Sequence, residues 1–146
     1  MTQESGNKSK WTKRRKILVA IAILFAVPLV VFMPGLFWEL HKASTALHGF
    51  TDALIAKQYE RAYEFTSPEL RAVTDYPAFV KLHDGLTLRM GDLKDVEVSQ
   101  IDIKERSDGW HGTADVQMNF ARGSLGFAFV LKKENHSWKI YSYQEQ

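Results

Sequence analysis

Histidines and carboxylates are the side chains that could do metal or acid–base chemistry in this sequence of 146 residues. His41 and His48 are seven residues apart, so they could share one face of a helix. A zinc ion takes three or four ligands, and no third histidine or carboxylate is spaced to join this pair. We therefore interpret both as surface or interfacial histidines, and we expect neither a metal ion nor another cofactor.

Acid–base catalysis would need titratable groups that are positioned together. His83 and Asp84 are neighbours in sequence, so they point in different directions and indicate a helix end, not a catalytic dyad. Asp52 and Asp115 are the best-placed lone carboxylates, but Asp115 has the phase of polar residues in its predicted strand and should face solvent. The absence of cysteine excludes thiol catalysis, disulfides and cysteine-based zinc sites. A non-catalytic protein is the favoured interpretation, and catalysis stays open.

Six aromatic residues are the remaining chemical signal. Aromatic side chains can line a pocket for an apolar ligand, but each also buries a large area when it packs in a core. Both interpretations stay open, and core packing is the favoured one. The candidate pocket residues are Tyr59, Tyr63, Phe79, Trp110, Phe127 and Trp138.

An apolar run of 22 residues, from 17 to 38, contains no charge. A helix of about 20 residues crosses the hydrocarbon layer of a bilayer, so we predict a transmembrane helix here. A cleaved signal peptide would have a shorter apolar core followed by small residues. This run instead closes with the bulky Phe37 and Trp38, which favours an uncleaved anchor.

The charges on the two sides of this run differ in sign. Residues 1–16 carry six basic residues and one acidic residue, whereas residues 39–146 carry 13 basic and 16 acidic residues. Positive charge stays in the cytoplasm, so we predict a cytoplasmic tail and a periplasmic or extracellular domain at the inner membrane. A mildly acidic domain is a poor match for phosphate backbones, and we expect no nucleic-acid partner. The flank that sets the orientation is Lys13, Arg14, Arg15 and Lys16.

The elements that must position these side chains begin with helices. Apolar residues at spacings of three and four predict one helix over residues 39–58. A short helix is predicted over residues 59–65. Ser67 followed by Pro68 predicts the start of another, and a further helix should run from Asp75 until residues 83–85.

In the second half of residues 39–146, apolar and polar residues alternate along the chain as they do in β-strands. Val96 and Val98 alternate in one phase and Ile101 and Ile103 in the other, so the slip at 99–100 predicts a β-bulge. Turn signals then separate three further strands. We therefore predict an α+β domain, with helices packed on one face of a curved antiparallel sheet of about four strands.

Two stretches resemble the nuclear-transport-factor-2-like (NTF2-like) superfamily of cone-shaped domains. They are AKQYERAYEFTSPELRAVTDYPAFVKL (56–82), with its TSPEL-like turn, and the Trp138-Lys139-Ile140 ending. The similarity spans roughly residues 42–144, and small membrane-anchored bacterial members are the most similar in layout. The resemblance implies the fold but no single function, because this superfamily includes isomerases, dehydratases and structural modules. No catalytic motif of the superfamily can be carried over residue by residue.

These observations predict a membrane-anchored binding or scaffolding module, such as an accessory or assembly subunit of a membrane or envelope complex. Its expected partners are membrane lipid, through residues 17–38, and another protein at the membrane, with a homodimer as a further form. The alternative is a small-molecule-binding protein or enzyme that uses an aromatic-lined cone cavity.

Overall fold

The computed structural model describes residues 35–146, of which Glu39–Gln146 form one compact unit. The predicted cytoplasmic tail (1–16) and most of the predicted transmembrane helix (17–38) lie outside the described residues. Across residues 35–146, none of the helices has both the length and the apolar character that a bilayer crossing requires. The basic flank also lies outside the described part: Lys13, Arg14, Arg15 and Lys16.

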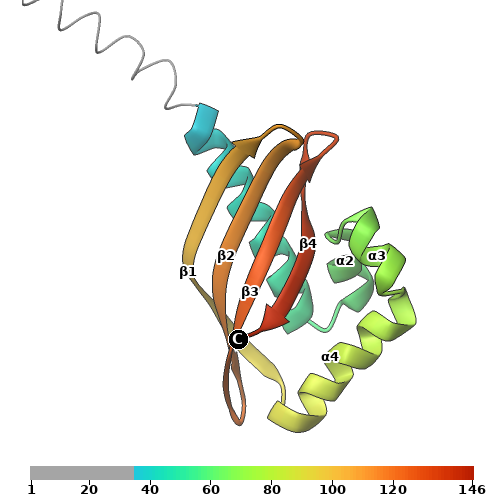
Figure 1. Cartoon of the computed structure of the whole chain (residues 1–146). Helices are drawn as coiled ribbons and strands as arrows, with labels where there is room; N and C mark the ends of the chain where they lie inside the picture. The colour runs from blue at the N-terminus through green and yellow to red at the C-terminus, as the bar shows by residue number, and fades with distance from the viewer. Residues whose placement is uncertain (1–34) are drawn as a thin grey trace, which may run out of the picture. The chain divides into compact units, whose positions relative to one another are not determined.

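Four helices precede the sheet in the described residues (Figure 1). The first is helical over residues 35–55, and the others are α2 (Tyr59–Glu64), α3 (Pro68–Val73) and α4 (Tyr76–Met90). The first helix ends three residues before its predicted end at residue 58, in a turn where Lys57 has a positive φ of 56°. The predicted apolar stripe of this helix is confirmed at four positions, spaced by three and four residues, whose side chains are buried. They are Ala43, Leu47, Phe50 and Leu54.

Local capping explains where α3 and α4 begin, and both starts confirm the prediction from sequence. The Ser67 side chain accepts a hydrogen bond from the backbone N–H of Leu70, with proline in the first turn. The Asp75 side chain accepts one from Ala78 in the same way, again with proline in the first turn. Each cap satisfies one of the backbone N–H groups that a helix start leaves without a partner.

The predicted end of α4 at residues 83–85 is wrong, because the helix continues to Met90. Glycine in a helix costs only about 1 kcal/mol relative to alanine, and Gly85 has open space around it. Beyond this glycine, Leu86 and Met90 pack against the core and so continue the buried face of the helix. Tertiary packing therefore outweighs the local helix-breaking signal.

The C-terminal half forms one antiparallel sheet of four strands in the order β1-β2-β3-β4. The strands are β1 (Leu93–Arg106), β2 (Gly109–Phe120), β3 (Gly123–Glu134) and β4 (Ser137–Glu145). The β1–β2 register shifts between Val98 and Gln100, which confirms the predicted bulge. Bulges bend a strand and increase its twist, and the sheet is curved accordingly (Figure 1).

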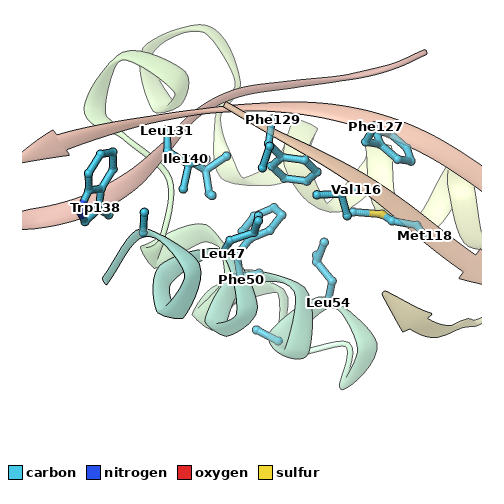
Figure 2. Close-up of a cluster of buried hydrophobic side chains, with 14 of the residues drawn as sticks. Leu47, Phe50, Leu54, Val116, Met118, Phe127, Phe129, Leu131, Trp138 and Ile140 are labelled. Carbon is cyan, nitrogen blue, oxygen red and sulfur yellow. The ribbon is translucent and has the colours of Figure 1, made fainter. Parts of the chain in front are cut away.

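The hydrophobic core lies between the first helix and the inner face of the sheet (Figure 2). Leu47, Phe50 and Leu54 point from the helix toward side chains of β2, β3 and β4. Along β2, buried and exposed residues alternate, so helices cover only one face of the sheet. This arrangement confirms the predicted α+β architecture.

A short segment between α2 and α3 also joins the sheet. The backbone N–H of Ile140 donates to the carbonyl of Phe65 at 2.8 Å, and the N–H of Ser67 donates to the carbonyl of Ile140 at 2.8 Å. Thr66 thereby forms a parallel bridge with Ile140 on the outer margin of β4. This bridge fixes the connection between the helical half and the last strand.

Candidate functional site

A histidine on α4, His83, is the least exposed titratable residue in the described part of the chain. His83 is 6% exposed and follows Phe79 by four residues, so both side chains leave the same face of the helix. Four aromatic rings surround the imidazole, and each comes from a different element. We call these rings the His83 cage: Phe50 from the first helix, Tyr59 from α2, Phe79 from α4 and Tyr143 from β4.

The rings of the His83 cage hold the imidazole from several directions. Tyr59 and Tyr143 stack on it with centroid distances of 6.0 and 5.9 Å. Phe79 meets it edge-on at 4.5 Å. The Nε2 atom of His83 and the hydroxyl oxygen of Tyr143 are 2.9 Å apart, which is a hydrogen bond. The imidazole is therefore fixed by both packing and a polar contact.

Burial changes the acid–base properties of this pair. It lowers the pKa of His83 to about 4, and the nearby charge of Asp84 opposes this change only in part. Burial also raises the pKa of the Tyr143 hydroxyl well above its usual range. Both groups are therefore neutral at pH 7. To act on a substrate, the pair would need a space beside it in which a substrate could lie.

The cavity beside His83 is small. It measures about 20 Å³, whereas ligand pockets usually measure roughly 300 to 1,000 Å³. A single water molecule needs a cavity of about 10 to 15 Å³, so this space has room for water but not for a substrate. The inner cavity is lined by Leu54, Tyr59, His83, Leu86, Thr87, Leu93, Met118 and Phe120.

A larger hollow lies on the surface beside α2. This groove measures about 480 Å³, but it is open to solvent and carries charges of both signs. Both cations of its lining already have partners, because Lys57 pairs with Asp92 at 2.7 Å and Arg61 donates to Gln58 at 3.2 Å. The groove is lined by Lys57, Gln58, Tyr59, Glu60, Arg61, Glu64 and Tyr76. It has no charge preference that would select one class of ligand.

The six predicted pocket residues belong to the core or pack against it. Phe79, Phe127 and Trp138 are buried in the core. Tyr59, Tyr63 and Trp110 are partly buried and pack against it. Of these six residues, all within the described part of the chain, only Tyr59 lines either of the two hollows.

The other predicted chemical residues lie apart from one another. Asp52, His41 and His48 are exposed along the first helix. Asp115 is exposed on β2, where its carboxylate accepts a 3.2 Å hydrogen bond from the Gln146 side chain. Among residues 35–146, no three histidine, aspartate or glutamate side chains are grouped so that they could hold a metal ion.

A second buried polar site joins the first helix to the sheet. Glu39 is 9% exposed and accepts hydrogen bonds from the Nε1 of Trp138 at 3.0 Å and the Nζ of Lys133 at 2.8 Å. Burial alone would raise the pKa of this carboxyl, but the bonds to Lys133 and Trp138, with the charges of Lys133 and Lys42, lower it below its ordinary value. Glu39 is therefore a structural anion whose two oxygens both have partners.

Sequence reasoning missed both buried polar sites. The sequence prediction places His83 at a helix end, although the helical spacing of residues 79, 83, 86 and 90 could have placed it on the inner face. The structure confirms only that His83 and Asp84 point in different directions, since the aspartate is exposed. No local signal links Glu39 to Trp138, because 99 residues separate them.

The comparisons with known proteins bear on the fold. No protein-family model matches the sequence, and no curated protein matches it. Among solved structures, the chain is similar to a Campylobacter jejuni protein described as an NTF2-like transpeptidase. That pair is 18% identical with a TM-score of 0.51, over 68% of this chain and 96% of the other.

Two further structures share this architecture. The protein Aln2 from a Streptomyces species is 11% identical with a TM-score of 0.53, over 72% of this chain and 87% of that one. A de novo designed protein with a curved β-sheet is 19% identical with a TM-score of 0.50, over 71% and 98%. Together these likenesses support an NTF2-like fold. At such low identity they show the fold alone, and the activity named for the Campylobacter protein is not carried over.

Proposed function

We propose that this chain is a membrane-anchored binding or scaffolding module without catalytic activity. In this proposal residues 17–38 cross the inner membrane, residues 1–16 stay in the cytoplasm, and the NTF2-like domain contacts a protein partner on the other side. The observation that carries the proposal is the small size of the cavity beside His83. Where a ligand would lie between α4 and the sheet, the side chains leave only about 20 Å³.

The end of the apolar run supports the anchor. Leu36, Phe37 and Trp38 are helical and 50%, 74% and 58% exposed. Large apolar side chains grouped in this way are unfavourable in water. A lipid environment would cover them, and a tryptophan at the end of an apolar run is suited to the headgroup layer.

Exposed apolar side chains on α3 and α4 support a protein partner. Val73 and Leu88 are 82% and 80% exposed, and Tyr76 and Leu82 are 40% and 47% exposed. The centre of a protein–protein interface is enriched in apolar and aromatic side chains and depleted of charge. The two most exposed of these residues, Val73 and Leu88, are therefore our choice of positions at which to test for a partner.

The topology can be tested by fusing alkaline phosphatase to Gln146. This reporter is active only outside the cytoplasm, so the fusion should be active and should fractionate with membranes. Reversing the flank charge by changing Lys13, Arg14, Arg15 and Lys16 to glutamate should reduce that activity. An inactive wild-type fusion, or one that is fully soluble after cell lysis, would refute the anchor.

The partner can be tested by purifying the tagged full chain in a mild detergent and identifying stoichiometric companions by mass spectrometry. We expect an envelope protein that is lost from the Val73→Glu/Leu88→Glu variant and retained by a matched Thr113→Glu/Gln117→Glu control on the exposed face of β2. Recovery of the chain alone would remove the support for a partner. A co-purifying small molecule in native mass spectrometry would favour the alternative of a ligand-binding protein.

A further inference from the structure

His83 combines three features: it is titratable, it is only 6% exposed, and it lines the inner cavity. From this arrangement we infer that protonation of His83 opens its aromatic cage, so that α4 loosens from the sheet and water enters the inner cavity when the surroundings become acidic. The inference does not require the anchor or a partner, and it can fail or hold independently of the proposed function.

The hydrogen bond of the neutral imidazole shows what protonation would change. A neutral imidazole has one donor and one acceptor, whereas an imidazolium has two donors and a full charge. The Tyr143 hydroxyl oxygen, 2.9 Å from Nε2, can accept a hydrogen bond from one of these two N–H groups. The charge itself would then lie among the rings of Phe50, Phe79 and the two tyrosines. Burying an uncompensated charge is strongly unfavourable.

The neutral groups around the imidazole offset this charge only in part. Phe50 on the first helix and Phe79 on α4 carry no titratable group. Tyr59 on α2 and Tyr143 on β4 are phenols whose pKa values burial raises, so they stay neutral. The faces of these two tyrosine rings attract a cation, which reduces the effect without removing it.

The charged groups near the cage already have partners of their own. Asp84 is the charge that acts on His83, but its carboxylate is exposed and accepts a 3.1 Å hydrogen bond from the Tyr59 hydroxyl. Lys57, which faces Tyr59 from the preceding loop, is paired with Asp92 at 2.7 Å. This pair contributes charges of both signs, so it supplies no net counter-charge for an imidazolium.

The direction of the effect follows from proton binding. Burial lowers the pKa of His83 from its ordinary 6.5 to about 4 in the folded chain. Between these two values the unfolded chain binds the proton and the folded chain does not, so stability falls as the pH falls. The shift corresponds to a loss of up to about 300-fold in the folding equilibrium constant, most of it between pH 6.5 and pH 4.

The test is urea unfolding of the full chain in a mild non-ionic detergent, monitored by near-ultraviolet circular dichroism and repeated at several pH values from 7 to 4. Between pH 7 and pH 4 the folding equilibrium constant of the wild type should fall by up to about 300-fold more than that of a His83→Phe/Tyr143→Phe variant. This variant keeps two aromatic rings but removes the titrating imidazole and the hydroxyl that is bonded to it. A His48→Gln variant, changed at an exposed histidine of the first helix, should follow the wild type. If the folding equilibrium constant of the double variant falls as steeply with pH as that of the wild type, the inference is wrong.

A second measurement covers the case in which the double variant does not fold. Selective labelling of histidine, phenylalanine and tyrosine in the wild-type chain allows the imidazole of His83 and the rings around it to be followed by NMR as the pH is changed. We expect a midpoint near pH 4, with ring resonances of Phe79 and Tyr143 shifting over the same range. A midpoint near 6.5, or a titration that leaves both rings unchanged, would overturn the inference.

Discussion

Gly49 lies directly against the ring of Phe65: a Cβ atom built on this glycine would be 2.5 Å from Cζ and 2.8 Å from Cε1 of the phenylalanine. The glycine sits in the middle of the first helix, where it would otherwise be unfavourable. Its missing side chain is therefore the space that Phe65 occupies. The loop after α2 can thus approach the first helix before it turns to bridge β4.

We predict that Gly49→Ala destabilises the domain. Alanine improves helix propensity by about 1 kcal/mol, but overpacking against a partly buried ring typically costs about 1 to 3 kcal/mol. Urea unfolding should show a net loss of about 1 kcal/mol. The matched control is Gly85→Ala on α4, where a Cβ meets nothing within 4 Å and stability should rise. A stabilised Gly49→Ala variant would contradict this account of the glycine.

The contact between Glu39 and Trp138 predicts a measurable coupling. Glu39→Ala removes the acceptor of the buried indole N–H and of Lys133. Leaving buried donors without a partner costs about 1 to 3 kcal/mol. In a double-mutant cycle with Trp138→Phe, the two losses should be less than additive by about 1 kcal/mol. Additive losses would show that the 3.0 Å bond contributes nothing to stability.

Glu39 also predicts a dependence on pH that is separate from that of His83. The pKa of its carboxyl is lowered in the folded chain, so the contribution to stability is present above the ordinary value of 4.5 and is lost as the pH falls below it. Glu39→Gln should therefore be less stable than the wild type at pH 7, and the difference should shrink toward pH 3. Chemical unfolding at each pH measures this difference. A gap that stays constant would refute the role of the charge.

The cap of α3 predicts a local loss of stability. Ser67→Ala removes the side-chain acceptor for the Leu70 N–H, and Ser67 is fully buried, so water cannot replace that acceptor. We expect a loss of about 1 kcal/mol, seen as a lower urea midpoint. Ser67→Thr keeps the hydroxyl and serves as the control. Equal midpoints for the alanine variant and the wild type would show that the cap is dispensable.

Features set by neighbouring residues were predictable from the sequence, and features set by distant ones were not. The helix starts at Ser67 and Asp75 depend on side chains three residues from their backbone partners. The bulge after Val98 depends on a change of phase within a few residues. By contrast, the continuation of α4 past Gly85 depends on burial against the sheet. Periodicity was therefore sufficient for the architecture but not for the length of this helix.

The same reasoning explains the candidate site. The rings of the His83 cage come from residues 50 to 143, and no short-range pattern brings them together. The favoured interpretation of the aromatic residues is that they fill the core and do not line an open pocket. Phe79 and Phe127 are buried in the core, in agreement with it. The anchor over residues 17–38 stays a prediction from composition and charge.

The bridge between Thr66 and Ile140 gives the sheet two unlike margins. On β4, the backbone groups of Ile140 are already bonded to Phe65 and Ser67, so a strand from another molecule cannot add at that point. On the other edge strand, β1, two register shifts make the strand irregular, and many of its side chains are charged. Such features discourage edge-to-edge pairing of sheets. The domain can therefore be held at high local concentration without its sheet extending from one copy to the next.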